Sequence, residues 1–286
     1  MKNVTFGYGN KIDIATLTAG SWQATLPLAN IKNKRLSKLA RSTNAANSST
    51  KFVIDFGSAQ PIQCIALILH NISVSGTVQI KGNSTNVFTS PLYDSGVIQV
   101  YPSGVIPTDL LEWEEDNFWL GTLSQQALAG YRSPFFKLLS TPQTLQYWQI
   151  EIFDSGNSDG YVQIGRVFVG KAFTPAKNIS YGHTLGDTDD SVFETSLSGE
   201  EFADIRTTYR THKFELSLLS KTEAYSNILD MQRTSGIVKE IFLIGDNDDT
   251  ENLNRRSFLG RFKNLNPISQ KTQSIYSCQF EVKEII

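Results

Sequence analysis

Cysteine, histidine and charge are all scarce in this sequence. Its 286 residues include two Cys and three His, and Asp, Glu, Lys and Arg together make up 19% of the chain, below the ~25% that is usual for soluble proteins. Cys64 and Cys278 are far apart and belong to no CxxC motif, so they predict two buried thiols rather than a disulfide framework or a zinc site. Ser, Thr, Asn and Gln take the place of the missing charges, which favours β-sheet surfaces over long solvated helices.

Other absences exclude whole classes of protein. The sequence contains no run of ~18 apolar residues that could span a membrane as a helix. The start of the chain, Met1–Gly7, has no apolar core of a signal peptide. A formal net charge of −2 gives no electrostatic basis for nucleic-acid binding. Neither GxGxxG nor a phosphate-binding GxxxxGKS or GxxxxGKT motif occurs. We therefore expect no membrane insertion, no nucleic-acid-specific binding and no cofactor.

The three histidines belong to no nucleophile motif. His70 ends an apolar run, His183 lies in a polar segment and His212 opens an alternating one. Nucleophilic catalysis needs a base held against a nucleophile, and no GxSxG motif places a Ser or Cys beside any of these residues. We therefore expect a protein that is not an enzyme and has no catalytic residues.

Two acidic turns have the composition of a metal-binding loop without its full pattern. One contains Asp187, Asp189 and Asp190, and the other contains Asp246, Asp248 and Asp249. The second turn has DxD spacing but lacks the Gly and the distal Glu of an EF-hand loop. Acidic residues are common in turns because their side chains bond nearby backbone amides. The expectation is therefore solvated turns and no metal site.

Region 1–175 has the pattern of short strands separated by turn residues. Phe52, Ile54 and Phe56 fall on one side of a strand at 51–57, and residues 62–69 form an apolar run typical of a strand buried on both faces. Further strands are expected at 76–82, 96–101, 146–153 and 161–170. Residues 20–49 and 107–145 are expected to be long loops. This pattern predicts a mainly β fold, a sandwich or jelly roll.

Region 206–286 has the order β-α-β-β-β. Strands are expected at 207–219, 237–244, 256–262 and 274–286, the last three of them antiparallel. Ser220 and Glu223 form a capping box, in which each side chain caps the other residue's backbone amide. The helix that they begin should run to about Ser235 and end at Gly236, which supplies the left-handed residue. We expect a smaller α+β domain here.

The composition of the chain changes between these two regions. Pro175, Gly182 and a run of acidic residues interrupt the pattern of strands. We expect a jelly-roll domain at 1–175, a linker or crossing segment at 176–205 and an assembly domain at 206–286. Residues 1–15 are candidates to pair with the last domain.

Three tryptophans are the candidates for contacting a glycan. Trp113 and Trp119 lie beside four acids in residues 112–119, and Trp22 lies in the long loop at 20–49. Carboxylates next to aromatic side chains occur in proteins that act on sugars, but here the acids are adjacent rather than on separate strands. Loops that are merely anchored by aromatic side chains are the other interpretation, and the sequence leaves both open.

The first region resembles discoidin-like, galactose-binding-like jelly rolls. The resemblance is carried by FVIDFG at 52–57, IQCIAL at 62–67, the strand around Trp148 and YVQIGRVFVG at 161–170. In that family the first of these patterns opens the sandwich and a closing strand ends it. The resemblance implies a jelly-roll β-sandwich and does not identify a ligand.

A second resemblance points to a particular class of protein. The segments SWQATLPLAN at 21–30, ARSTN at 40–44, LHNIS at 69–73, and GRVFVGKAFTP at 165–175 followed by NISYG at 178–182 are similar to tail proteins of long-tailed bacteriophages. The β-α-β-β-β order is similar to the tail-tube and distal-tail fold. In that fold a sandwich flanked by one helix assembles into a ring around the tail lumen.

The resemblance to tail proteins implies a structural virion protein of the tail tip or baseplate, made in the bacterial host cytoplasm. Its partners would be further copies of itself, in a homo-oligomeric ring, and other phage tail proteins, with the jelly roll facing outward. The alternative is a carbohydrate-binding module that recognises a host surface glycan. That alternative predicts solvent-facing rings at Trp22, Trp113 and Trp119.

Overall fold

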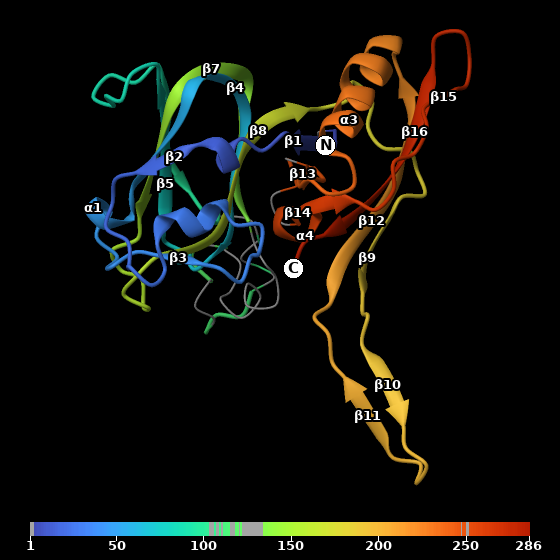
Figure 1. The fold of residues 1–286 in the computed structure, drawn as a ribbon, viewed down its shortest axis with the longest axis horizontal. Helices are drawn as coiled ribbons and strands as arrows, with labels where there is room; N and C mark the ends of the chain where they lie inside the picture. The colour runs from blue at the N-terminus through green and yellow to red at the C-terminus, as the bar shows by residue number, and fades with distance from the viewer. Residues whose placement is uncertain are drawn as a thin grey trace.

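Figure 1 shows the computed structural model, in which two lobes lie side by side and an extended hairpin projects away from them. The structure describes residues 3–286 except 103–105, 107–108, 110, 115–117, 120, 122–133, 247 and 250–251. Among the described residues, 14 strands join one continuous hydrogen-bonded sheet and two more strands form the hairpin. The predicted mainly β class is confirmed.

The N-terminal lobe is a β-sandwich. Its strands are β1 (Thr5–Tyr8), β2 (Thr16–Thr18), β3 (Ala40–Arg41), β4 (Phe52–His70), β5 (Thr77–Asn83), β6 (Tyr93–Gln99), β7 (Phe135–Phe153) and β8 (Gln163–Phe173). Short helical turns are η1 (Ile12–Ile14), η2 (Leu28–Lys32) and α1 (Asn47–Thr50). The expected long loop at 20–49 therefore contains η2, β3 and the start of α1.

The long strands β4 and β7 run through both sheets of the sandwich. Residues 52–55 of β4 pair with β2 and with the second half of β7. Residues 64–67 of β4 pair with β8 and with the first half of β7. Between these halves the register shifts, and Gly57 has a φ of +70°, which only glycine adopts without steric cost. One bent pair of strands thus supplies both facing sheets, in a jelly-roll-like arrangement.

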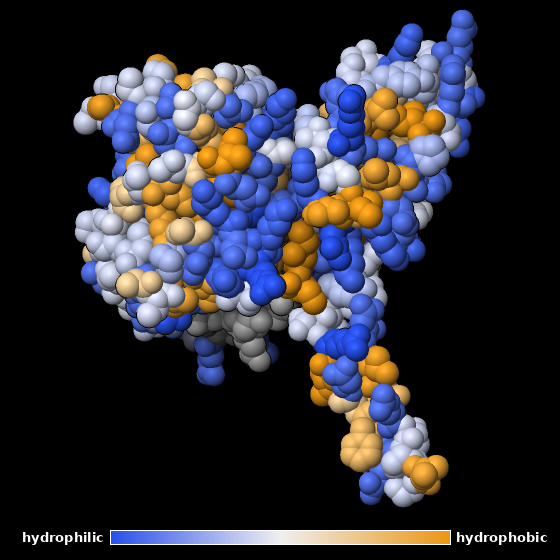
Figure 2. Space-filling view, in the orientation of Figure 1, coloured by the Kyte–Doolittle hydropathy of each residue, from blue (hydrophilic) through white to orange (hydrophobic). Residues whose placement is uncertain are grey.

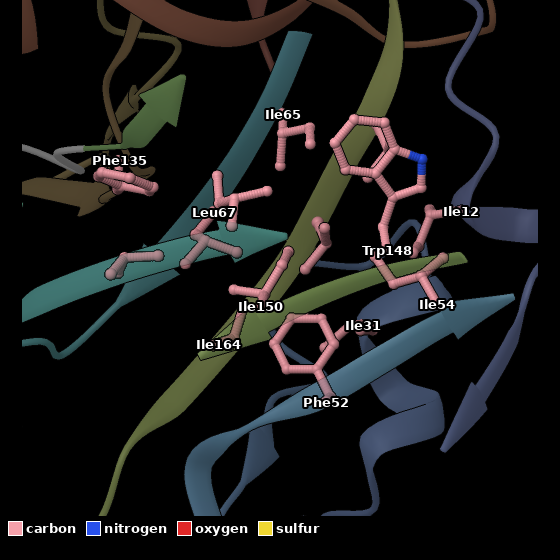
Figure 3. Packing of buried hydrophobic residues seen from close by; sticks show 14 of the residues in the cluster. Ile12, Ile31, Phe52, Ile54, Ile65, Leu67, Phe135, Trp148, Ile150 and Ile164 are labelled. Carbon is pink, nitrogen blue, oxygen red and sulfur yellow. The ribbon is translucent and has the colours of Figure 1, made fainter. Parts of the chain in front are cut away.

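Apolar side chains of β4 and β7 meet in the core of the sandwich, together with side chains such as Ile12, Ile31 and Ile164 from other elements (Figure 3). Phe52 lies opposite Ile150 across the strand pair, and Ile54 lies opposite Trp148. All four side chains are fully buried. Each such side chain stabilises the fold by ~1.5–3 kcal/mol when it leaves water, so this alternation holds the register of the two strands.

The C-terminal lobe follows the expected β-α-β-β-β order. Its strands are β9 (Thr184–Thr188), β12 (Tyr209–Leu219), β13 (Ile241–Ile244), β14 (Ser257–Phe262), β15 (Ser269–Gln270) and β16 (Tyr276–Glu284). Its helical segments are η4 (Glu223–Leu229, π-helical), α3 (Asp230–Ser235) and α4 (Leu253–Arg256). The pairs β13–β14 and β14–β16 are antiparallel, as predicted, and β12 pairs with β16 and with the edge strand β9.

The predicted capping box begins the helical segment. The Ser220 backbone N–H donates to Glu223 Oε2 at 2.9 Å, and the Glu223 N–H donates to Ser220 Oγ at 3.3 Å. Gly236 ends the segment with a φ of +55°, and its N–H donates to the Gln232 carbonyl at 2.8 Å. Both ends of the helix were therefore correctly predicted from local sequence.

The two lobes are joined by β1, which lies between β8 and β13 in the sheet. Phe6 is opposite Phe173 of β8 on one side and opposite Leu243 of β13 on the other. A shared hydrophobic cluster packs Phe168 against Phe242, with 6.1 Å between ring centroids. The domain boundaries near 175 and 205 stay predictions, because the sheet runs from one lobe into the other.

The segment expected as a linker or crossing segment contains three strands. After β9 the chain continues into β10 (Val192–Thr195) and β11 (Glu201–Asp204), which pair only with each other among the described strands. Every residue of these two strands is exposed, and the hairpin stands clear of both lobes (Figure 1). We call residues 192–204 the arm.

Candidate functional site

Two of the three candidate tryptophans face solvent and lie together. The side chains of Trp113 and Trp119 are 71% and 76% exposed, and their ring centroids are 5.8 Å apart in an edge-on arrangement. Phe118 lies within 5.6 Å of Trp113 and 5.4 Å of Trp119. Part of the acidic cluster between them, residues 115–117, lies outside the described residues. The exposed rings of Trp113 and Trp119, with the half-buried ring of Phe118 against them, form an exposed aromatic group, which is the kind of surface on which a sugar face can stack.

Trp22 lies in a different environment. Its ring is half-buried and packs edge-on against Phe52, with 6.0 Å between centroids. Its indole Nε1 is buried without a hydrogen-bond partner, and a Cβ added at Gly20 would lie 2.6 Å from that nitrogen. The nitrogen edge of Trp22 therefore points into the loop backbone. Its ring contact is with the sandwich core, not with the exposed aromatic group.

A polar surface lies where β4 ends and β8 begins. The guanidinium of Arg41 sits 4.0 Å from the ring centroid of Tyr161 and donates to Gln163 Oε1 at 3.2 Å. Arg41 Nε is buried and has no hydrogen-bond partner in the structure. Because β3 pairs with β8 at this point, the backbone itself holds the cation over the aromatic ring.

Asn71 connects the strand ends beneath this polar surface. Its Oδ1 accepts from the Gln163 N–H at 2.8 Å, and its Nδ2 donates to Asp159 Oδ2 at 2.8 Å and to the Tyr161 carbonyl at 3.1 Å. Arginine, an aromatic ring, an amide and a carboxylate on one surface can bond polyol hydroxyls and stack a sugar ring. The sequence analysis did not identify this group as a site, since its members are brought together by β pairing rather than by a motif.

Burial changes the acid–base behaviour of two of the three histidines, His70 and His212. His70 Nδ1 accepts from the Ile72 N–H at 3.3 Å, and the ring packs against Tyr101. Burial lowers the pKa of His70 to about 4, against an opposing effect of Asp154. Burial also lowers the pKa of His212 to about 4, with help from the positive charges of His183 and Arg256.

Both cysteines are buried and free, as predicted. Burial raises the pKa of the Cys64 thiol to about 12. It also raises the pKa of Cys278 to about 11, against a hydrogen bond from Gln232. A thiol with so high a pKa is not ionised near neutral pH and is a poor nucleophile.

The two acidic turns use their carboxylates on their own backbone and on arginine. Asp189 accepts from the Ser191 N–H at 2.8 Å, and Asp249 accepts from Arg256 Nη1 at 2.9 Å and from the Asn252 N–H at 3.2 Å. Among the residues that the structure describes, no group of three His, Cys, Asp or Glu side chains could hold a metal ion. Within those same residues, no helix has the length and apolar character needed to cross a membrane.

Comparisons with known proteins find likeness only among solved structures. No family model matches the sequence, and no curated protein matches it. A family 32 carbohydrate-binding module from a Clostridium perfringens family 31 glycoside hydrolase is 11% identical, with a TM-score of 0.37 over 57% of this chain and 99% of that one. The C. perfringens NanJ module in complex with galactose is 12% identical, with a TM-score of 0.38 over 58% and 99%.

A fucose-binding module from Streptococcus pneumoniae is 10% identical, with a TM-score of 0.36 over 57% of this chain and 98% of that one. The likeness is to a jelly-roll module and is too low to transfer a ligand to this chain.

The arm is a structural feature that the sequence analysis did not predict. It carries large apolar side chains in the open, with Phe193 68% and Phe202 61% exposed and Leu197 fully exposed at the turn. Figure 2 shows these hydrophobic patches along the length of the hairpin. Two aromatic residues among acids, in a stretch with no Lys or Arg from 192 to 204, were the available signal.

Proposed function

We propose that this chain is a structural component of a bacteriophage tail tip or baseplate, which assembles as a homo-oligomeric ring and docks other tail proteins with its sandwich facing outward. The observation that carries the proposal is the arm. A two-stranded hairpin on its own is marginally stable in water, and this one exposes Phe193, Leu197 and Phe202. Apolar side chains on a projecting element mark a surface that another protein covers.

The edge of the main sheet supports the same proposal. β9 is the terminal strand of the sheet at the C-terminal lobe, and its residues are almost all exposed. Exposed edges and apolar hairpins invite pairing with another chain, and proteins that persist in solution cover them. Oligomerisation with copies of the same chain, in a closed ring, covers every such edge at once. The proposed location in the virion tail rests on the sequence resemblance to tail proteins alone.

Two measurements test this proposal. Light scattering after size-exclusion chromatography should give a mass that is a multiple of 31.8 kDa, and mass spectrometry of purified tailed particles should find the chain. A strictly monomeric protein that is absent from purified virions would overturn it.

Recognition of a host surface glycan is the second candidate function. It is favoured by the exposed aromatic group at Trp113 and Trp119 and by the polar surface at Arg41, Tyr161 and Asn71. The two functions are compatible, because the observations that favour the first lie on the arm and on the edge strand β9, whereas those that favour the second lie on the sandwich. Glycan-array binding by the purified chain, compared with aromatic-to-alanine variants, tests the second function separately.

A further inference from the structure

A groove of about 490 Å³ lies where the two lobes meet the root of the arm. Lys34 of the sandwich, Val238 and Arg261 of the C-terminal lobe and the terminal Ile286 are among its lining residues. Pockets of ~300–1,000 Å³ are large enough to enclose small ligands. This groove therefore has room for one or two large side chains of another protein.

Part of the groove is apolar and open to solvent. Val238 is 70% exposed and Ile286 is 46% exposed, and Ile237 next to Val238 is also exposed. Figure 2 shows hydrophobic side chains on the visible face between the two lobes, where the C-terminus lies in Figure 1. Adjacent exposed aliphatic side chains in a concave surface are typical of an interaction site.

Among the side chains that line the groove, the cations Lys34, Arg206, Arg261 and Lys283 outnumber the acids Asp190, Glu240 and Glu284. Of its acids, Glu240 is bonded to Arg166 and Glu284 to Arg210. The remaining acid, Asp190, lies 3.7 Å from Lys283.

Arg206 in the same groove is paired with Asp204 at the base of the arm. Lys34 and Arg261 are exposed, and within the described part of the chain neither has an ion-pair partner. Two cations thus remain to attract an acidic partner.

The segment of the sandwich that contains Lys34 is rich in basic residues. Between Asp13 and Asp55 the chain contains no acidic residue. Its basic residues in that stretch are Lys32, Lys34, Arg35, Lys38, Arg41 and Lys51. Opposite potentials on two surfaces steer their encounter and exclude like-charged partners. The preferred occupant of the groove is therefore both acidic and apolar.

The arm has this combination of properties. Its acids are Glu194, Glu200, Glu201 and Asp204, and it contains no Lys or Arg. In the hairpin register Glu194 is opposite Phe202 and Thr195 is opposite Glu201. Because neighbouring positions of a strand face opposite sides, one face presents Phe202 with Glu194 and the other presents Phe193 with Glu201.

The arm projects away from both lobes (Figure 1), and none of its residues is among those that line the groove. We propose that the arm of one subunit docks into the groove between the lobes of the next copy of the same chain. This inference rests on the proposed ring function. The contact joins two different surfaces, so it is a head-to-tail interface, which closes into a ring when the rotation between subunits permits. Leu197 and a phenylalanine would fill the apolar part, with the glutamates beside Lys34 and Arg261.

Cross-linking tests this contact directly. We would combine Leu197→Cys at the arm tip with Val238→Cys in the groove and oxidise the full chain with copper phenanthroline. The native thiols are buried and should not react. The expected product is a ladder of covalent dimers, trimers and higher species on a non-reducing gel. The matched control pairs Leu197→Cys with Leu92→Cys and should give no ladder. Leu92 is another exposed leucine and is not among the residues that line the groove.

The charges give an independent test. Lys34→Glu with Arg261→Glu should weaken self-association at least tenfold, and adding Glu194→Lys with Glu201→Lys should restore it. Lys38→Glu, an exposed cation on the same basic segment, should have a much smaller effect.

The outcomes separate this inference from the function on which it rests. The chain could form oligomers that give no cross-linked ladder with Val238→Cys and whose self-association is unchanged by Lys34→Glu with Arg261→Glu. In that case the proposed docking site is wrong, but assembly into a ring is not contradicted. A ladder of equal strength with Leu92→Cys also overturns the docking site. If the unmodified chain is monomeric under all conditions, the ring function itself is wrong.

Discussion

Arg166 of β8 and Glu240 just before β13 form a buried ion pair that ties the two lobes together. Arg166 Nη2 lies 2.5 Å from Glu240 Oε1, and Arg166 Nε lies 3.1 Å from each carboxylate oxygen. Asn10 also donates to Glu240, and Asp13 lies 2.7 Å from Arg166 Nη2. Burial opposes the charge of Arg166, but hydrogen bonding and attraction from Glu240 and Asp13 raise its pKa.

Removing one partner of this pair should destabilise the protein strongly. Glu240→Gln leaves the guanidinium of Arg166 buried with less compensation, and such changes cost about 3–5 kcal/mol. The measurement is the free energy of unfolding from urea denaturation. Glu151→Gln, which breaks the more exposed pair with Lys81, is the matched control and should cost less than about 1 kcal/mol. Equal losses for the two variants would contradict a special role for the buried pair.

Stability should fall between neutral and mildly acidic pH because of the buried histidines. A histidine in the unfolded chain has a pKa of ~6.5, whereas His70 and His212 have pKa values of about 4 in the fold. The unfolded state therefore binds more protons between these values, so stability is highest above pH 6.5, drops as pH falls and levels off below 4. At pH 5 the loss is roughly 2 kcal/mol for each histidine.

The pH dependence can be assigned by substitution. His70→Asn keeps an acceptor for the Ile72 amide but cannot take up a proton, so its plot of unfolding free energy against pH should be shallower than that of the unmodified chain. His183→Asn changes an exposed residue. The slope of its unfolding free energy against pH should stay close to that of the unmodified chain. An unchanged slope in His70→Asn would show that this ring is accessible to protons in the fold.

The capping box should have a measurable effect on the C-terminal lobe. Ser220→Ala removes the hydroxyl that accepts from the Glu223 amide, and losing an N-cap costs about 1 kcal/mol. Thermal unfolding followed by circular dichroism measures the change. Ser37→Ala, at an exposed loop position, is the control and should leave the unfolding temperature unchanged within experimental error. A Ser220→Ala variant as stable as Ser37→Ala would mean that tertiary packing alone holds the helix.

If the sandwich binds glycans through its exposed aromatic group, Trp113→Ala and Trp119→Ala should each lower affinity at least tenfold on a glycan array. The reason is that each ring offers a face for stacking at an exposed position. Tyr181→Ala removes another fully exposed ring and serves as the control. Equal binding by all three variants would exclude Trp113 and Trp119 as contacts, and loss of binding on Arg41→Ala alone would move the site to the polar surface.

Local patterns predicted the longer strands and the helical segment after Ser220, but missed several short strands, and they assigned the first half of β7 to a loop. The capping box at Ser220 and Glu223 and the alternation of Phe52, Ile54 and Phe56 depend on residues a few positions apart, and both are found in the structure. The sequence predicted two separate strands, at 51–57 and 62–69, where the structure has the single bent strand β4. Gly57, with its positive φ, makes the change of direction without ending the strand.

Long-range packing accounts for what the sequence could not show. Trp22 is half-buried because Phe52, 30 positions later, lies under its ring. The polar surface forms because pairing brings Arg41 beside Gln163. The arm escaped prediction because neither of its faces is buried, so its apolar residues show no strand periodicity. Val192 and Phe193, for example, are adjacent and both exposed.

The most direct test of the account compares the full chain with one in which residues 192–204 are replaced by a short Gly-Ser turn. Multi-angle light scattering at matched concentrations reports the mass of each, and the circular dichroism spectrum reports the fold. We predict a closed oligomer for the full chain and a folded monomer for the armless one. A full chain that stays monomeric, or an armless chain that forms the same oligomer, would contradict assembly through the arm.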